Sequence, residues 1–196
     1  STLYMSQDYI ETFCQRAAQA AEKLAGDNYE IILVNDGSPD NSLRIAQQQF
    51  DQNPHIRIVD LSRNFGHHKA MMTGLGFARG ELVFLIDSDL EEAPEWLDEF
   101  ADELDQTGCD VVYGVQSKRK GGLSERLSGA AFYKLVPLIS GIDLPANTVT
   151  ARLMRRNYVD ALLRHDERQM FIAGLWHLTG FDQRALPVTK LCSSPS

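Results

Sequence analysis

Two carboxylates one residue apart follow a strongly apolar segment and are the clearest chemical signal in the sequence. Residues 82–86 are all apolar, and Asp87, Ser88 and Asp89 come directly after them. Carboxylate oxygens are the ligands that Mg²⁺ and Mn²⁺ prefer, and these ions keep positions open for substrate phosphates. Glu91 could add a third oxygen. The pattern favours a metal site over the alternative, a solvated turn with helix-capping acids.

A second polar turn ends another apolar segment. Residues 29–34 form a β-rich run, and Asn35, Asp36 and Gly37 follow it. Gly37 permits a tight turn, and the Asp36 carboxylate could accept hydrogen bonds from a nucleobase N–H or from ribose hydroxyls. An Asx-turn that caps the next helix is the alternative, and both roles can coexist in this turn.

The apolar periodicity predicts the elements that position these turns. Strands are expected over 29–34, 56–61, 82–86 and 111–115, and helices over 10–24, 43–50, 66–79, 96–104, 123–139, 158–163 and 171–178. Strand–helix alternation indicates an α/β fold with a mostly parallel sheet between helices. Ligands bind at the carboxyl ends of such strands, which is where both polar turns lie.

Positive charge follows the strand expected over 56–61. Arg63 and Lys69 lie close to its carboxyl end, so they are expected at the same sheet edge as the polar turns. His67 and His68 are adjacent and diverge on a helix, so surface or capping roles are expected for them rather than a metal site.

Length and composition limit the classes of protein that fit. The 196 residues are 43% hydrophobic and 23% charged, as in a globular domain, which we place at residues 1–185 with a tail or linker at 186–196. No apolar run approaches the ~20 residues of a membrane-spanning helix. Cys14, Cys109 and Cys192 are isolated, which argues against a zinc site or a disulfide framework and favours a reducing compartment.

The charge is unevenly distributed. The net charge of −8 argues against nucleic-acid binding. Residues 1–116 carry 7 basic and 21 acidic side chains, whereas residues 117–156 carry 8 basic and 2 acidic ones. The basic segment suggests an anionic partner such as phosphate or a membrane surface; a solvated loop is the alternative.

Three motifs in this order resemble the family 2 glycosyltransferases of the GT-A fold, a Rossmann-like α/β fold. They are residues 29–40, 61–66 and 87–95, and the likeness extends to 112–115 and 152–156 and covers roughly residues 2–185. Within this family, the sequence most resembles the branch of polyprenyl-phosphate sugar transferases, which includes dolichol-phosphate mannose synthase and bactoprenol glucosyltransferases.

This resemblance implies a metal-dependent inverting transferase that uses a nucleotide-diphospho-sugar donor and Mg²⁺ or Mn²⁺. The expected donor-binding residues are Thr2, Leu3, Tyr4, Asn35, Asp36, Asn64, Lys69, Asp87 and Ser88. The expected metal ligands are Asp89 and Glu91, and the expected catalytic residues are Asp87, Asp89 and Arg152. Residues 2–4 resemble the end of the family's first strand, the rest of which is expected to be cut short.

The acceptor implied by the resemblance is a polyprenyl phosphate, met at the cytoplasmic face of the cell membrane during cell-wall or polysaccharide synthesis. Lys118, Arg119, Arg126 and Arg152 are expected to meet the acceptor phosphate or the lipid head groups. Two alternatives remain: a transferase that elongates a glycan at a sugar hydroxyl, and an inactive nucleotide-sugar-binding module. The second is motivated by Thr150, Ala151 and Met170, which replace residues common in the family.

Overall fold

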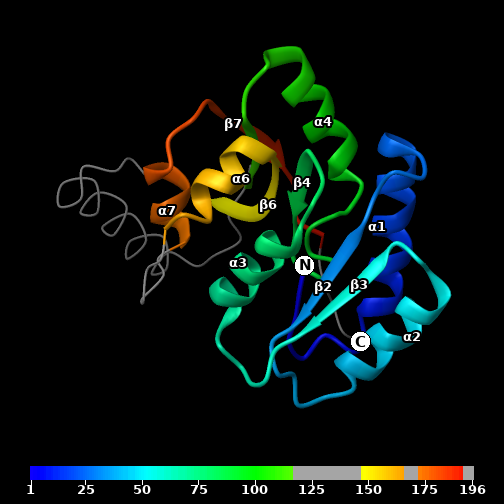
Figure 1. Ribbon diagram of the computed structural model, residues 1–196. Helices are drawn as coiled ribbons and strands as arrows, with labels where there is room; N and C mark the ends of the chain where they lie inside the picture. Colours follow the sequence, from blue (N-terminus) through cyan, green and yellow to red (C-terminus); the bar gives the residue numbers. More distant parts are fainter. Residues whose placement is uncertain (117–146, 166–171, 192–196) are drawn as a thin grey trace, which may run out of the picture.

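The computed structural model describes residues 1–116, 147–165 and 172–191 as an α/β fold in which helices flank two sheets (Figure 1). The strands are β1 (Thr2–Leu3), β2 (Ile31–Asn35), β3 (Ile56–Asp60), β4 (Leu82–Leu85), β5 (Val111–Gln116), β6 (Thr148–Arg155) and β7 (Gln183–Val188). The helices are α1 (Ile10–Ala25), α2 (Ser42–Gln52), α3 (His67–Phe77), α4 (Trp96–Thr107), α6 (Arg156–Leu162) and α7 (Ile172–Leu178). The expected fold class is confirmed.

The first sheet has the order β1-β2-β3 and is parallel throughout. It arises from two successive strand–helix–strand units, in which the helices α1 and α2 return the chain to the same end of the sheet. Leu3, Leu33 and Ile56 are fully or almost fully buried in its core, against Phe13 of α1. The carboxyl ends of β1, β2 and β3 therefore lie along one edge, which brings their turns together.

The second sheet has the order β4-β6-β5-β7, and β6 runs antiparallel to both of its neighbours. β6 and β7 were not predicted, and β6 is an exception to the expected parallel order. β7 pairs in parallel with β5 from Gln183 to Val188, so the expected domain end at residue 185 falls inside this strand. The helix expected over 123–139 lies outside the described residues.

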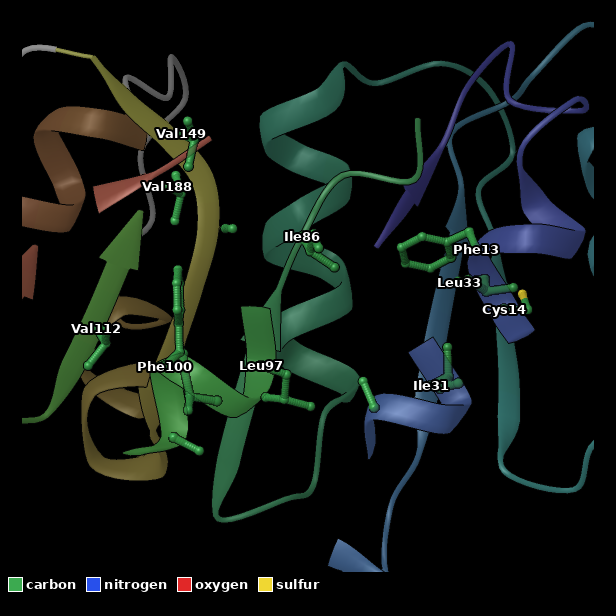
Figure 2. Close-up of a cluster of buried hydrophobic side chains, with 14 of the residues drawn as sticks. Phe13, Cys14, Ile31, Leu33, Ile86, Leu97, Phe100, Val112, Val149 and Val188 are labelled. Atoms are coloured by element: carbon green, nitrogen blue, oxygen red, sulfur yellow. The ribbon is translucent and has the colours of Figure 1, made fainter. Parts of the chain in front are cut away.

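A cavity of about 610 Å³ separates the facing edges of β2 and β4, and α1 and α3 also line it. Leu82, Val83 and Phe84 of β4 are consequently only partly buried, although the sequence predicted a buried strand. Beyond the cavity the core is continuous through Ile86, which follows β4. Figure 2 shows Ile86 between Phe13 and Leu33 on one side and Leu97 and Phe100 of α4 on the other.

Within the described ranges, the structure contains no helix that is long and apolar enough to span a bilayer.

Candidate active site

The acidic turn, residues 87–92, begins where β4 ends. Ser88 at its centre is buried, and its hydroxyl donates a hydrogen bond of 2.9 Å to the carbonyl oxygen of Thr2. Leu90 has a φ of 62°, in the left-handed region, so the chain reverses sharply after Asp89. The hydrogen bond from Ser88 to Thr2 fixes the acidic turn to the end of β1. The expected contact of Ser88 with a donor remains a prediction.

The first carboxylate of this turn faces the first residue of α3. His67 Nε2 lies 3.4 Å from Asp87 Oδ1, and its Nδ1 lies 3.0 Å from Thr2 Oγ1. The surface position expected for His67 is confirmed, since its side chain is 47% exposed, and its ring also joins β1 to the acidic turn, a contact that sequence reasoning did not predict. A usable signal was present: His67 opens the helix that follows β3, so it had to lie at the carboxyl edge of the first sheet.

The second carboxylate of the acidic turn, that of Asp89, is bonded within the turn. Asp89 Oδ1 accepts a hydrogen bond from the Glu91 amide at 3.0 Å. Burial raises the pKa of Asp89, and the charges of Asp87 and Glu91 raise it further. Burial and like charge both disfavour the ionised form of a carboxylate.

Glu92 is a functional candidate that sequence reasoning missed. Its side chain is fully buried, and Oε1 accepts a hydrogen bond from the amide of Thr150 in β6 at 3.0 Å. Burial, followed by the charge of Asp87, raises the pKa of Glu92 to about 7. Lys190, which follows β7, lies 3.1 Å from Glu91 Oε2 and 3.6 Å from Glu92 Oε1. Residue 190 was expected in a tail or linker, and no local pattern indicates its contact with the acidic turn.

The paired turns, residues 35–40 and 62–66, form the second part of the site. Asp36 is buried, and its carboxylate accepts hydrogen bonds from the amides of Phe65 at 2.7 Å and Gly66 at 3.0 Å. Gly37 has a φ of +60°, and a Cβ at this position would lie 2.5 Å from the Arg63 carbonyl carbon. A side chain at residue 37 would therefore force the two turns apart.

The other residues of the paired turns divide into buried and exposed groups. The Asn35 side chain is buried and donates to Asp60 Oδ1 at 2.8 Å. Asn64 and Lys69 are exposed, and Tyr4 is half exposed while Leu3 is buried. Asp36 shapes the turn at residues 62–66 through its bonds to the backbone. The exposed side chains of Tyr4, Asn64 and Lys69 are the ones that a ligand can reach. Their expected contacts with a donor remain predictions.

Arg152 lies in β6 opposite Leu85 and is almost completely buried. Its guanidinium carbon lies 3.0 Å from the centroid of the Trp176 ring, and burial lowers its pKa to about 9. Its expected contact with a phosphate remains a prediction. Lys118, Arg119 and Arg126 lie outside the described residues.

The donor set of the acidic turn suits a hard divalent cation, because Asp87, Asp89 and Glu91 supply only carboxylate oxygens. In the part of the chain that the structure describes, no three His, Cys, Asp or Glu side chains already converge as a metal site.

Comparison with known proteins identifies the family. The family model described as "Glycosyl transferase family 2" matches residues 2–163. The chain is 49% identical over 190 residues to "Putative glycosyltransferases" of Mycobacterium tuberculosis, covering 97% of this chain and 55% of that protein. It is 38% identical over 189 residues to "Uncharacterized glycosyltransferase YkcC" of Bacillus subtilis, covering 96% and 58%. The chain thus spans little more than half the length of these relatives.

Solved structures agree on the fold. A mannosyltransferase from Pyrobaculum calidifontis, in complex with GDP-Man and Mn²⁺, matches with a TM-score of 0.66 at 17% identity, over 95% of this chain and 53% of its own. S. aureus TarS 1–349, in complex with UDP-GlcNAc, matches with a TM-score of 0.64 at 20% identity, over 98% and 58%. With the family model and the close relatives, this establishes that the chain belongs to the family 2 glycosyltransferases and has a GT-A fold.

Proposed function

We propose that this glycosyltransferase transfers a sugar, with inversion, from a nucleotide-diphospho-sugar to a polyprenyl phosphate. The single observation that carries the donor half of the proposal is the joining of the acidic turn to the end of β1 by Ser88 and His67. These contacts bring Asp87 and Ser88 to the end of β1, the strand that pairs with β2, and the paired turns follow β2 and β3. The mannosyltransferase and TarS structures, which hold GDP-Man with Mn²⁺ and UDP-GlcNAc respectively, support this class of donor.

The acidic turn would serve the diphosphate of the donor. Asp89 and Glu91 would hold a divalent ion, which supplies positive charge to the leaving diphosphate. Asp87, held by His67, would orient the sugar-bearing end of the donor. Stabilising charge that develops on a leaving group is often the largest single contribution to catalysis, so these carboxylates are the residues on which turnover should depend most.

The paired turns would receive the nucleoside. Asp36 fixes the backbone of residues 65 and 66, so the turn is already shaped before a ligand arrives. Such preorganisation reduces the ordering cost of binding. Half-exposed Tyr4 beside this turn offers a ring face to a base.

A phosphate acceptor is supported by the chemistry at residue 150. The family resemblance implies an acidic residue at the position where Thr150 stands, and the Thr150 amide is already bonded to Glu92. A hydroxyl acceptor needs a general base, whereas a phosphate arrives ionised. Residues 117–134 carry five basic and one acidic side chain, a net charge that would suit anionic lipid at the inner face of the membrane, where each surface cation contributes about 1 kcal/mol. Arg152 and Arg155, also in the basic segment, are instead engaged within the fold.

The decisive experiment measures transfer from a panel of radiolabelled nucleotide-sugars to a short polyprenyl phosphate, with Mn²⁺ or with EDTA. We expect Mn²⁺-dependent transfer from one donor, and co-sedimentation with anionic vesicles at low salt. Transfer only to a soluble saccharide would show that the acceptor is a glycan hydroxyl and not a polyprenyl phosphate. Binding of a donor without transfer or hydrolysis would indicate an inactive binding module.

A further inference from the structure

The end of β7 contacts the acidic turn through a cation and through the backbone. Lys190 Nζ donates a hydrogen bond of 3.1 Å to Glu91 Oε2 and lies 3.6 Å from Glu92 Oε1. The amide of Leu191 donates to the carbonyl oxygen of Glu91 at 2.8 Å. Glu91 is thus held at both its side chain and its main chain by two successive residues from 99 positions further along the chain.

The ion pair between Lys190 and Glu92 is sheltered from solvent, and the pair between Lys190 and Glu91 is partly so. The side chains of Lys190, Glu92 and Glu91 are 26%, 0% and 38% exposed, whereas Lys23, which pairs with Asp98, is 71% exposed. Water screens a sheltered charge less, so its interactions are stronger. Burial alone would lower the pKa of Lys190, but the charges of Glu92 and then Glu91 outweigh it and raise the pKa.

One oxygen beside this contact lacks a hydrogen-bond partner among the residues that the structure describes. This oxygen is the buried Glu92 Oε2, while Oε1 is shared between the Thr150 amide and Lys190. A buried carboxylate with an unsatisfied oxygen depends strongly on the nearby cation. Removing Lys190 would therefore change the charge of the turn and take one cation away from the Glu91 carboxylate.

We propose that Lys190 is a positioning residue of the acidic turn, whose ammonium competes with the divalent ion for the Glu91 carboxylate. This inference rests on the proposed function, because it takes Asp89 and Glu91 as the ligands. Glu91 would hold the ion with the carboxylate that now accepts from Lys190, and the second contact of Lys190, with Glu92, would keep its ammonium beside the turn. The end of β7 thereby sets the affinity of the turn for the ion.

The test titrates Mn²⁺ alone into the protein and follows free Mn²⁺ by electron paramagnetic resonance. Lys190→Met should bind Mn²⁺ about tenfold more tightly than the wild type, because the competing cation is gone. Lys190→Arg, which keeps the charge, should stay within about threefold of the wild type. Lys23→Met is the matched control, since it removes a lysine from an exposed ion pair that does not include a residue of the acidic turn. The affinity for Mn²⁺ should not change in this variant.

The outcomes separate this inference from the proposed function. If the wild type binds Mn²⁺ through Asp89 and Lys190→Met binds it equally or more weakly, the competition is refuted and the metal site stands. If the wild type binds no Mn²⁺, or Asp89→Asn binds it as well, the metal site itself is refuted.

A measurement on the wild type covers the case in which Lys190→Met does not fold. Lysine-selective NMR should show the Lys190 ammonium signal shifting on addition of Mg²⁺ while the Lys23 signal stays fixed. An unmoved Lys190 signal at saturating Mg²⁺ would overturn the proposal.

Discussion

The paired turns and the acidic turn lie at one edge of the fold but are held in different ways. In the paired turns, Asp36 reaches partners 29 and 30 residues away, within neighbouring strand–helix units. The acidic turn is held by Thr2, Thr150 and Lys190, which lie 86, 58 and 99 residues from their partners. The first is a local assembly that can form with β1–β3, whereas the second is complete only when β6 and β7 are in place.

The largest expected effect comes from removing charge in the acidic turn. Asp89→Asn should lower turnover by at least about a hundredfold, because asparagine keeps the size but loses the charge that a divalent ion needs. Its amide oxygen can still accept from the Glu91 amide, so the thermal midpoint should stay within about 2 °C. Steady-state kinetics and calorimetry check both parts. Normal metal-dependent turnover in this variant would show that Asp89 is not a metal ligand.

Loosening the acidic turn from β6 should affect stability more than removing the Asp36 carboxylate from the paired turns. Glu92→Ala removes the acceptor of the Thr150 amide and the partner of Lys190, and should cost about 2–3 kcal/mol. Glu92→Gln keeps an acceptor for that amide and should cost less. Urea unfolding in EDTA measures both variants. If Glu92→Ala lowered the free energy of unfolding less than Asp36→Ala, the Glu92–Thr150 contact would not be a main support of the acidic turn.

The pH dependence of stability gives Glu92 a separate signature. Its folded pKa of about 7 lies above the ordinary value of 4.5, so the folded state binds more protons between these limits. Stability contributed by the neutral acid is therefore full below about pH 4.5 and is lost as the pH rises through 7. The wild type should lose more stability than Glu92→Gln over this window in EDTA. Parallel profiles for the two proteins would show that Glu92 titrates normally.

Breaking the paired turns should have a smaller effect and should spare the metal. Asp36→Ala leaves the Phe65 and Gly66 amides without their acceptor and should cost about 2 kcal/mol in unfolding free energy. Donor affinity should fall tenfold to about a hundredfold as the turn loses its shape. Calorimetry with each nucleotide measures the affinity. Unchanged affinity for every nucleotide that binds would limit Asp36 to a structural role.

The smallest effect is expected at the start of α2. Asp40 accepts a hydrogen bond from the Ser42 amide at 2.9 Å, and Asp40→Ala should cost about 1 kcal/mol. Burial alone would raise the pKa of Asp40, but bonds from Ser38 and Ser42 outweigh it and lower the pKa to about 2. This stability is present above the ordinary pKa of 3.8 and is lost as the pH falls through 2. Acid unfolding of the variant at a lower pH than the wild type would contradict this role.

The difference between the two regions also explains what the sequence could predict. The strands β2–β5 and both polar turns follow from local patterns, because each apolar run ends in polar residues with turn preferences. β6 was missed because Arg152 and Arg155 interrupt its apolar pattern, although Arg152 stacks on Trp176 and Arg155 donates to the Cys109 carbonyl. β7 contains Pro187, which weakened its strand signal.

The missed site residues have the same origin. Glu92 and Lys190 act through partners that only the paired strands β5, β6 and β7 bring together, and no local spacing encodes that approach. His67 could have been placed from its position after β3. Sequence reasoning therefore located the acidic turn but not the segments that hold it.

The central claim is that the acidic turn, and not the paired turns, supplies the metal dependence of donor binding. Calorimetric titration of a panel of nucleoside diphosphates, with Mn²⁺ and with EDTA, tests it on the wild type, Asp89→Asn and Asp36→Ala. We expect Mn²⁺ to strengthen binding of one nucleotide at least about tenfold in the wild type and in Asp36→Ala, and not in Asp89→Asn. An equal Mn²⁺ enhancement in Asp89→Asn, or its loss in Asp36→Ala alone, would contradict the account.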